Sequence, residues 1–325
     1  MENQLKPRSL TFKHITVAAR EAIKEIDQRR KGLIKPLKTP WNTFNRGLSG
    51  GIEWNNIGVV GGSSGSGKSA VVNILETGLK DLNPDQNFNI LNFNFEMLSK
   101  RIVGRKLSSK FKLTTSQLFS GMEDFKVNDG LYNKLIDECK KLVNYGIYYV
   151  DQPGTVEEID NTIEAFVEYT LKQNSDKGVI VFLDHALLVN GKDGDMERKV
   201  LFDLMSMMNR QKKKHKITFI LLSQLNRNIE SKERLLEPTL HYPMKSDLFG
   251  ADAMFQFADW VLIIHRPEML HLSQYGPQRL PTKDRIFYHY IKTREAEPFV
   301  AMMYNNLKHN EIKDWSEYEK ETREA

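Results

Sequence analysis

A run of small residues at 62–69 reads Gly-Ser-Ser-Gly-Ser-Gly-Lys-Ser and lies between two apolar segments. An apolar stretch ends at Val60 before the run, and Ala70 starts an apolar helical pattern directly after it. The run matches the P-loop pattern at every fixed position, and that motif requires a strand before it and a helix after it. A flexible Gly/Ser linker would not join a buried strand to an apolar helix. The sequence therefore predicts an α/β domain whose first strand and helix meet at a phosphate-binding turn.

The residue types of this loop suit a nucleoside triphosphate and a magnesium ion. Glycines let the backbone curl so that successive N–H groups face the phosphates. The Lys68 ammonium supplies positive charge to the β and γ phosphates, and the Ser69 hydroxyl is placed to bind Mg²⁺. We therefore predict ATP and Mg²⁺ as cofactors. The predicted cofactor-binding residues are Gly62, Ser63, Ser64, Gly65, Ser66, Gly67, Lys68 and Ser69.

Short β-branched or aromatic runs alternate with helical patterns through most of the chain. Such alternation indicates βαβ crossovers and a mostly parallel, buried central sheet flanked by helices. Two runs near the end, 286–292 and 298–304, are separated by a short turn and predict a β-hairpin instead. The other expected strands are 57–60, 88–95, 147–150, 179–183, 218–222 and 260–264, and the expected helices include 69–80, 156–172 and 198–214.

Two acidic residues stand at the ends of predicted strands. Asp184 ends an apolar run that begins at Val179, and an acid in that position holds magnesium through water in P-loop NTPases. The alternative for Asp184 is a strand that simply ends in a polar turn. Glu96 ends the run Phe93-Asn94-Phe95 near the same edge of the sheet. Its position allows either a base that activates the attacking water or a helix-capping acid for a helix that starts near Ser99.

The composition indicates a soluble intracellular protein. The only cysteine, Cys139, cannot form an internal disulfide, and no run of about 18 apolar residues or secretory signal is present. The formal net charge of +5 is compatible with a polyanionic partner, although a solvated basic surface is the plainer explanation. We predict a cytoplasmic location, which would be the host cytoplasm for a phage-encoded protein, and no membrane association.

An amphipathic helix is predicted at 15–31, ahead of the first strand. Ile15, Ala18, Ala22 and Ile26 share one face, and basic residues occupy the rest of the surface. A helix of this kind needs an apolar groove to cover that face. Either its own domain or a neighbouring subunit supplies the groove.

Taken in order, these motifs resemble the motor domain of DnaB-type replicative helicases, which belong to the RecA-like P-loop ATPases. The resemblance spans about 39–304 and begins at Thr39-Pro40-Trp41-Asn42-Thr43-Phe44. Phe95-Glu96-Met97 is similar to the family's strand end, which implies that Glu96 activates the attacking water. Ser223-Gln224-Leu225-Asn226-Arg227 matches a specific family signature, which implies that Gln224 senses the γ-phosphate and couples it to the nucleic-acid loops.

A basic pair in the terminal hairpin also resembles the family. Lys292-Thr293-Arg294 is similar to the pair that reaches the ATP site of the adjacent subunit. An arginine supplied in this way stabilises charge on the transferring phosphoryl group and accelerates hydrolysis by about 10³–10⁵-fold. The alternative for Lys292 and Arg294 is two solvent-facing cations in a hairpin. With Glu96, Gln224 and Lys68 they complete the predicted catalytic set.

The sequence departs from the family pattern in two places. After Asp184 the family has a tyrosine and a second polar sensor, whereas here the run is His185-Ala186-Leu187, which puts the coupling of hydrolysis to strand movement in doubt. Ser246-Asp247-Leu248 keeps the family spacing, but Phe249 follows where the family carries charged DNA contacts. Phe249 either stacks on a base or acts as a buried anchor. Backbone contacts would come from Arg227, Lys232, Arg234 and Lys245, or these residues form a merely solvated loop.

We therefore expect three segments: an arm with the linker helix (1–38), a RecA-like ATPase motor (39–306) and a charged C-terminal tail (307–325) that is frayed or helical at its end. The arm leaves no room for the family's N-terminal domain, so a motor-only version is expected. The resemblance implies an ATP-hydrolysing helicase that forms a homo-oligomeric ring, a hexamer by analogy, moves on single-stranded DNA, and works with a loader or primase. The alternatives are a RecA-like recombination or clock-type ATPase and a non-unwinding, ATP-switched DNA-binding adaptor.

Overall fold

The computed structural model describes residues 12–122, 126–191, 196–237, 241–294 and 296–324, and the chain divides into two units, 1–36 and 37–325. The first unit contains one helix, α1 (Ile15–Arg30), whose start is capped by His14 Nδ1, which accepts from the Thr16 amide at 3.2 Å. The predicted helix is confirmed to within one residue. Its apolar side chains Ile15 and Ile26 are exposed.

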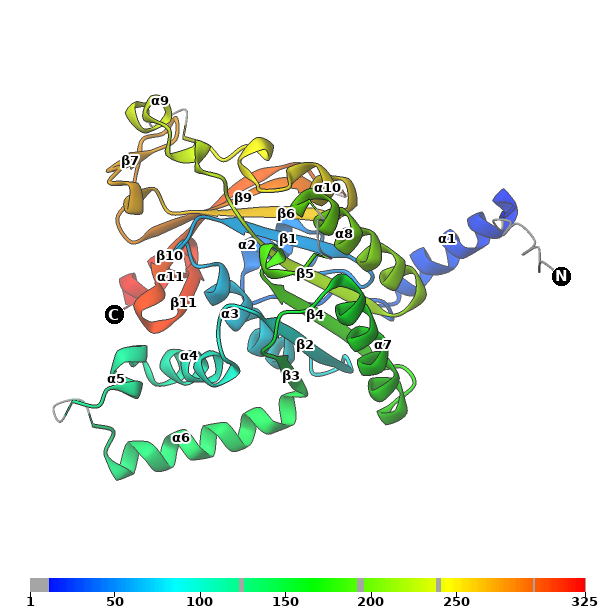
Figure 1. Cartoon of the computed structure of the whole chain (residues 1–325), viewed down its shortest axis with the longest axis horizontal. Helices are drawn as coiled ribbons and strands as arrows, with labels where there is room; N and C mark the ends of the chain where they lie inside the picture. The colour runs from blue at the N-terminus through cyan, green and yellow to red at the C-terminus, as the bar shows by residue number, and fades with distance from the viewer. Residues whose placement is uncertain (1–11, 123–125, 192–195, 238–240, 295, 325) are drawn as a thin grey trace. The chain divides into compact units, whose positions relative to one another are not determined.

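The second unit is built on a sheet with nine strands among the described residues, in the order β11-β10-β9-β6-β1-β5-β4-β2-β3 (Figure 1). All pairings from β6 across to β3 are parallel, and those of β9, β10 and β11 are antiparallel. The predicted mostly parallel sheet with a C-terminal hairpin is therefore confirmed. The strands are β1 (Ile57–Gly62), β2 (Phe88–Asn94), β3 (Ile147–Val150), β4 (Gly178–Asp184), β5 (Ile217–Gln224), β6 (Trp260–His265), β9 (Arg285–Thr293), β10 (Phe299–Asn306) and β11 (Glu311–Asp314). A separate two-stranded sheet contains β7 (Gln274–Tyr275) and β8 (Leu280–Pro281).

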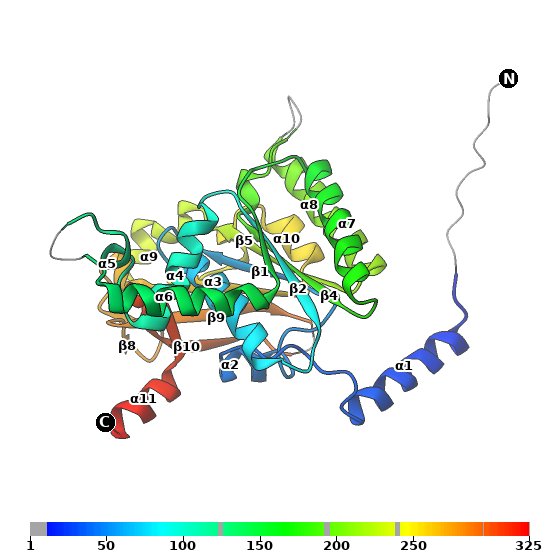
Figure 2. The same cartoon turned by 90° about the horizontal axis from the view of Figure 1, so that it is seen from below.

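Helices cover both faces of the large sheet (Figures 1 and 2). On one face lie α7 (Val156–Gln173), α8 (Glu197–Lys214) and α10 (Ala251–Phe257); on the other lie α2 (Asn42–Gly47) and α3 (Lys68–Leu82). Next to α3, α4 (Ser99–Phe111) is followed by α5 (Thr115–Phe119) and α6 (Asp129–Leu142). The short α9 (Lys232–Leu236) follows β5, and α11 (Trp315–Glu324) is near the C-terminal end. In the described residues no helix combines the length and the apolar character that crossing a membrane requires.

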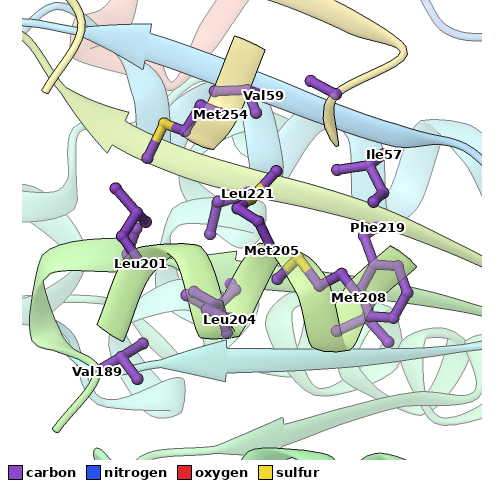
Figure 3. Packing of buried hydrophobic residues seen from close by; sticks show 14 of the residues in the cluster. Ile57, Val59, Val189, Leu201, Leu204, Met205, Met208, Phe219, Leu221 and Met254 are labelled. Atoms are coloured by element: carbon purple, nitrogen blue, oxygen red, sulfur yellow. The ribbon is translucent and has the colours of Figure 1, made fainter. Parts of the chain in front are cut away.

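Strand alternation divides the core into two layers. In β1, Ile57 and Val59 pack toward α8, whereas Val60 packs with α3 on the other face. Figure 3 shows Leu204 and Met208 of α8 directed at the first of these layers. Each fully buried side chain of this size contributes about 1.5–3 kcal/mol. The two layers hold the carboxyl end of β1, and with it the P-loop, in a fixed place.

The end of the chain differs from the predicted charged tail. Glu311–Asp314 forms β11, which pairs antiparallel with β10, and Ile312 is buried. The Trp41 indole N–H donates to the Ile312 carbonyl oxygen at 2.9 Å. A four-residue strand with a single apolar residue carries almost no alternation signal, which explains why the sequence pattern missed it. Beyond it, α11 matches the expected terminal helix.

Candidate nucleotide-binding site

The P-loop connects β1 to α3 at the carboxyl edge of the sheet. Gly67 is the N-cap of α3 with φ at 108°, a conformation that favours glycine, and Gly65 has φ at 73°. The Lys68 ammonium donates to the carbonyl oxygens of Gly62 at 2.7 Å and Ser63 at 2.9 Å. Burial lowers the pKa of Lys68, and the carboxylates of Asp184 and Glu96 oppose that shift. The predicted loop thus presents a helix N-terminus and one ammonium to the same space.

Ser69 and Asp184 meet beside this loop. The Ser69 hydroxyl donates to Asp184 Oδ2 at 3.0 Å, whereas Oδ1 is buried and has no hydrogen-bond partner within the part of the chain that the structure describes. Burial raises the pKa of the Asp184 carboxyl, and the nearby Glu96 charge adds to this. The β2–β4 register pairs Asn94 with Asp184, which brings Glu96 to the same edge.

This pair of oxygen ligands fits a magnesium ion. Mg²⁺ prefers hard oxygen donors and binds with one or two protein oxygens, several waters and substrate phosphates. A cation would satisfy the orphaned Asp184 Oδ1 and offset its burial. Among the described residues no group of three or more His, Cys, Asp or Glu side chains is arranged to hold a metal ion.

A cleft of about 280 Å³ lies over the P-loop and gathers the other predicted residues. Glu96 lines it and is exposed, and Gln224 lines it from the end of β5. Six lining residues were not predicted as site residues: Ala70, Met97, Arg105, His185, Leu307 and Asn310. The structure therefore brings Lys68, Ser69, Glu96 and Gln224 together around one space, and Asp184 adjoins it through its hydrogen bond with Ser69.

Arg105 is the most informative of the unpredicted residues. It lies on α4 and lines the cleft, and burial lowers the pKa of its guanidinium while the charges of Asp184 and Glu96 oppose the shift. An arginine guanidinium beside a phosphate-binding loop suits an anionic γ-phosphate. Sequence reasoning missed it because α4 is rich in basic residues, and nothing in the pattern shows which of them faces the cleft.

Gln224 connects the cleft to a second loop. It pairs with Gly62 across the β1–β5 ladder, and its carbonyl oxygen accepts from the Phe249 amide at 3.0 Å. The Asn226 amide donates to the Asp247 carbonyl oxygen at 2.8 Å in the same contact. The two segments that resemble the family signature are thus joined by backbone hydrogen bonds, as a phosphate sensor coupled to a loop requires.

The predicted nucleic-acid residues differ in their availability. Arg227 and Lys232 are exposed, and Lys245 is exposed with Asp252 at 3.3 Å. The Arg234 side chain is only 12% exposed, forms an ion pair with Asp247 at 2.7 Å and donates to the Tyr242 carbonyl oxygen at 2.6 Å. Arg234 therefore stabilises its own loop, and its predicted contact with the DNA backbone stays a prediction.

Phe249 is half-buried and lines a groove of about 770 Å³ with Leu201, Phe202 and Arg198 of α8. The stacking role and the anchoring role of Phe249 both stay predictions.

Lys292 and Arg294 lie at the opposite edge of the sheet from the P-loop. Trp260 pairs with Gly58 at the start of β1 and with Thr293 at the end of β9, so Arg294 follows at that edge. Arg294 Nε lies 2.9 Å from Asp259 Oδ1, with the side chain 54% exposed. The Lys292 ammonium donates to the Phe255 carbonyl oxygen at the end of α10. The chain does not bring either cation to its own nucleotide cleft.

The sequence matches a family model described as "DnaB-like helicase C terminal domain" over residues 37–301. Similar curated proteins include a probable replicative DNA helicase of Guillardia theta, 21% identical over 92% of this chain and 46% of that protein. Replicative DNA helicase DnaB of Mycobacterium intracellulare is 25% identical over 54% of this chain and 28% of its own length. The chain therefore spans less than half of the length of these relatives.

Solved structures show the same fold. The structure titled "ATPase Domain of G40P" superposes with a TM-score of 0.77 at 19% identity, covering 94% of this chain and 99% of that one. A DnaB-like replicative helicase, solved in a study of its interactions with primase, gives a TM-score of 0.74 at 18% identity over 94% of this chain and 67% of its own.

Proposed function

The chain belongs to the DnaB-like helicase family, and on that premise we propose that it is an ATP-hydrolysing motor of a homo-oligomeric ring that moves on single-stranded DNA and unwinds duplexes in the cytoplasm. The observation that carries the proposal is that the nucleotide cleft and the predicted arginine for hydrolysis lie at opposite edges of the sheet. The cleft holds Lys68, Glu96 and Gln224, whereas Arg294 lies at the other edge of the sheet. Family membership favours this function over a recombination or clock-type ATPase and over a non-unwinding adaptor.

The residues of the cleft divide the work of hydrolysis. The P-loop amides and Lys68 bind the phosphates, and Ser69 with Asp184 would hold Mg²⁺, which neutralises charge on the β and γ phosphates. Glu96 orients a water and takes its proton as the water oxygen bonds to the γ-phosphorus and the bond to the ADP oxygen breaks. Arg105 stabilises charge on the transferring group, and Gln224 reports its presence to the loop at Phe249.

The position of Arg294 supports the proposed assembly. A six-residue strand such as β1 is about 20 Å long, which exceeds the reach of an arginine side chain. We propose that Arg294 serves the cleft of a neighbouring subunit, which would make hydrolysis depend on a closed ring. We propose a hexamer, with the exposed face of α1 docking on the neighbour.

The exposed basic residues Arg227, Lys232 and Lys245 would grip the DNA backbone. Binding through phosphate contacts releases counterions, so affinity should fall steeply as salt rises. We infer a loader or primase as a further partner, because the DnaB-like helicase compared above has interactions with primase.

ATP turnover with and without single-stranded DNA tests the proposal, with Glu96→Gln as the matched variant. We expect DNA-stimulated turnover in the wild type and loss of turnover in Glu96→Gln with nucleotide binding retained. A wild type that is as inactive as Glu96→Gln under both conditions would sink the motor function. Retained nucleotide binding in such a protein would instead support the ATP-switched adaptor.

A further inference from the structure

A buried polar network joins α3 to α4. The Lys106 ammonium donates to Glu76 at 2.5 Å and to Asn73 Oδ1 at 2.6 Å, and the Lys106 and Glu76 side chains are 5% and 0% exposed. Glu76 also accepts from the Tyr149 hydroxyl at 3.2 Å and from the Asn92 amide. The network therefore links α3 and α4 to strands β2 and β3.

Stability alone does not account for this ion pair. Desolvating two charges costs several kcal/mol per ion, and well-packed apolar residues of similar volume often hold such a site equally well or better. What the pair does provide is a fixed orientation of α4. The Lys106 ammonium can donate to both Glu76 and Asn73 at only one rotation of α4 about its axis. The network thus sets the orientation of α4 relative to α3.

That orientation matters because two successive residues of α4 have different roles: one lines the nucleotide cleft, and the next belongs to the buried network. Arg105 lines the nucleotide cleft, and Lys106 turns toward α3. Successive residues of an α-helix point about 100° apart, so fixing Lys106 also fixes the direction of Arg105. A second contact locks the same helix, since Asn310, which also lines the cleft, donates to the Ser108 hydroxyl at 3.1 Å.

The partner helix is the one that begins at the P-loop. Helix α3 starts at Lys68, and Glu76 lies about two turns further along it. The element that holds the phosphates therefore also holds the network, and the network holds the helix that bears Arg105.

We propose that Lys106 is a positioning residue which, through Glu76, fixes α4 against α3 so that the Arg105 guanidinium is held at the γ-phosphate of bound ATP. The inference rests on the proposed function, because it takes the cleft to be an ATP site. The consequence is selectivity in binding. The network raises the affinity for nucleotides that have a γ-phosphate, and it leaves the affinity for ADP unchanged.

The test compares the affinities of ADP and of ATPγS by fluorescence titration of the full chain, together with ATP turnover. Lys106→Met removes the ammonium at similar length. Glu76→Gln with Lys106→Met also removes the carboxylate that would otherwise stay buried and unpaired, so it keeps the test possible if the single variant unfolds. The matched control is Lys80→Met, a half-buried lysine of α3, which donates to the Phe88 carbonyl oxygen at 2.7 Å outside the network.

We expect both network variants to lower the preference for ATPγS over ADP by about tenfold, the value of one charge-assisted hydrogen bond, with ADP affinity unchanged. Lys80→Met should keep the wild-type preference. In an Arg105→Ala background, Lys106→Met should have no further effect, because a residue that acts through Arg105 is not additive with it. Turnover should follow the same pattern in kcat/KM for ATP, because weaker binding of the γ-phosphate raises KM.

Two results would overturn the positioning role. One is a double network variant with the wild-type ATPγS preference, and the other is additive losses from Arg105→Ala and Lys106→Met. Failure of the proposed function looks different, because the wild type would then hydrolyse no ATP with or without DNA; the inference falls with it only if the wild type also binds neither nucleotide. A wild type that binds both nucleotides but hydrolyses neither still reports on Lys106 through the affinity ratio.

Discussion

Replacing Arg294 with alanine should remove ATP turnover while leaving the fold and nucleotide binding intact. The Arg294 side chain is 54% exposed, and its ion pair with Asp259 is therefore worth at most about 1 kcal/mol. Asp259 keeps Lys212 at 2.6 Å and the Ile57 amide at 2.7 Å when the arginine is gone. The melting temperature should change by no more than about 3 °C.

The effect on turnover should be much larger. Loss of an arginine that stabilises the transferring phosphoryl group lowers kcat by about 10³-fold or more. Because Arg294 lies a full strand length from its own P-loop, this loss must come from the neighbour's site. Nucleotide affinity should stay near that of the wild type, since Lys68 and the P-loop amides are untouched.

Mixed rings test that geometry directly. Subunits carrying Arg294→Ala and subunits carrying Glu96→Gln are each inactive alone, but a site owned by the first and completed by the second has both groups. In an equal random mixture about a quarter of the interfaces of a cyclic assembly are of this kind, so turnover should recover to about a quarter of wild type. The control mixture pairs Arg294→Ala with Glu96→Gln/Arg294→Ala, in which no complete site forms. If the test mixture is no more active than this control, Arg294 does not act in trans.

Three further predictions concern nucleotide binding and stability. Lys68→Ala should abolish the nucleotide-induced rise in stability, about 2.7 kcal/mol for the wild type at 100 times Kd, as measured by thermal melting with and without ATP; an undiminished shift would contradict the P-loop assignment. Gly58→Ala places a Cβ 1.9 Å from Trp260 Cζ2 and should cost about 1–3 kcal/mol in urea unfolding, whereas Gly121→Ala, with nothing within 4 Å, should be neutral. Burial lowers the pKa of His289 to about 3, so the unfolded state takes up a proton below about pH 6.5 while the folded state stays neutral. As pH is lowered from about 6.5 to about 3, this group should therefore reduce the free energy of unfolding by up to about 1.4 kcal/mol per pH unit. His289→Phe should flatten the dependence of the unfolding free energy on pH, and an unchanged dependence would refute the assignment.

Local patterns in the sequence determined the frame of the molecule and half of its site. The P-loop, the strands that flank it and the acids Glu96 and Asp184 at strand ends were all predicted, and the family was identified from them and is confirmed. These features are readable because a parallel strand is a continuous apolar run, and because the carboxyl ends of such strands share one edge of the sheet. The roles of the individual site residues remain predictions.

Only the tertiary structure decided which charged side chains face which environment. Arg105 points into the cleft, Lys106 next to it is buried against Glu76, and Arg234 is paired with Asp247 inside its loop. In the sequence these are ordinary basic residues of helices and loops. Their surroundings depend on helix rotation and on partners 13 to 30 residues away, which no local pattern encodes. The same reason explains why the sequence predicted a trans-acting arginine but not its distance from its own P-loop, since that distance exists only once β1, β6 and β9 are paired.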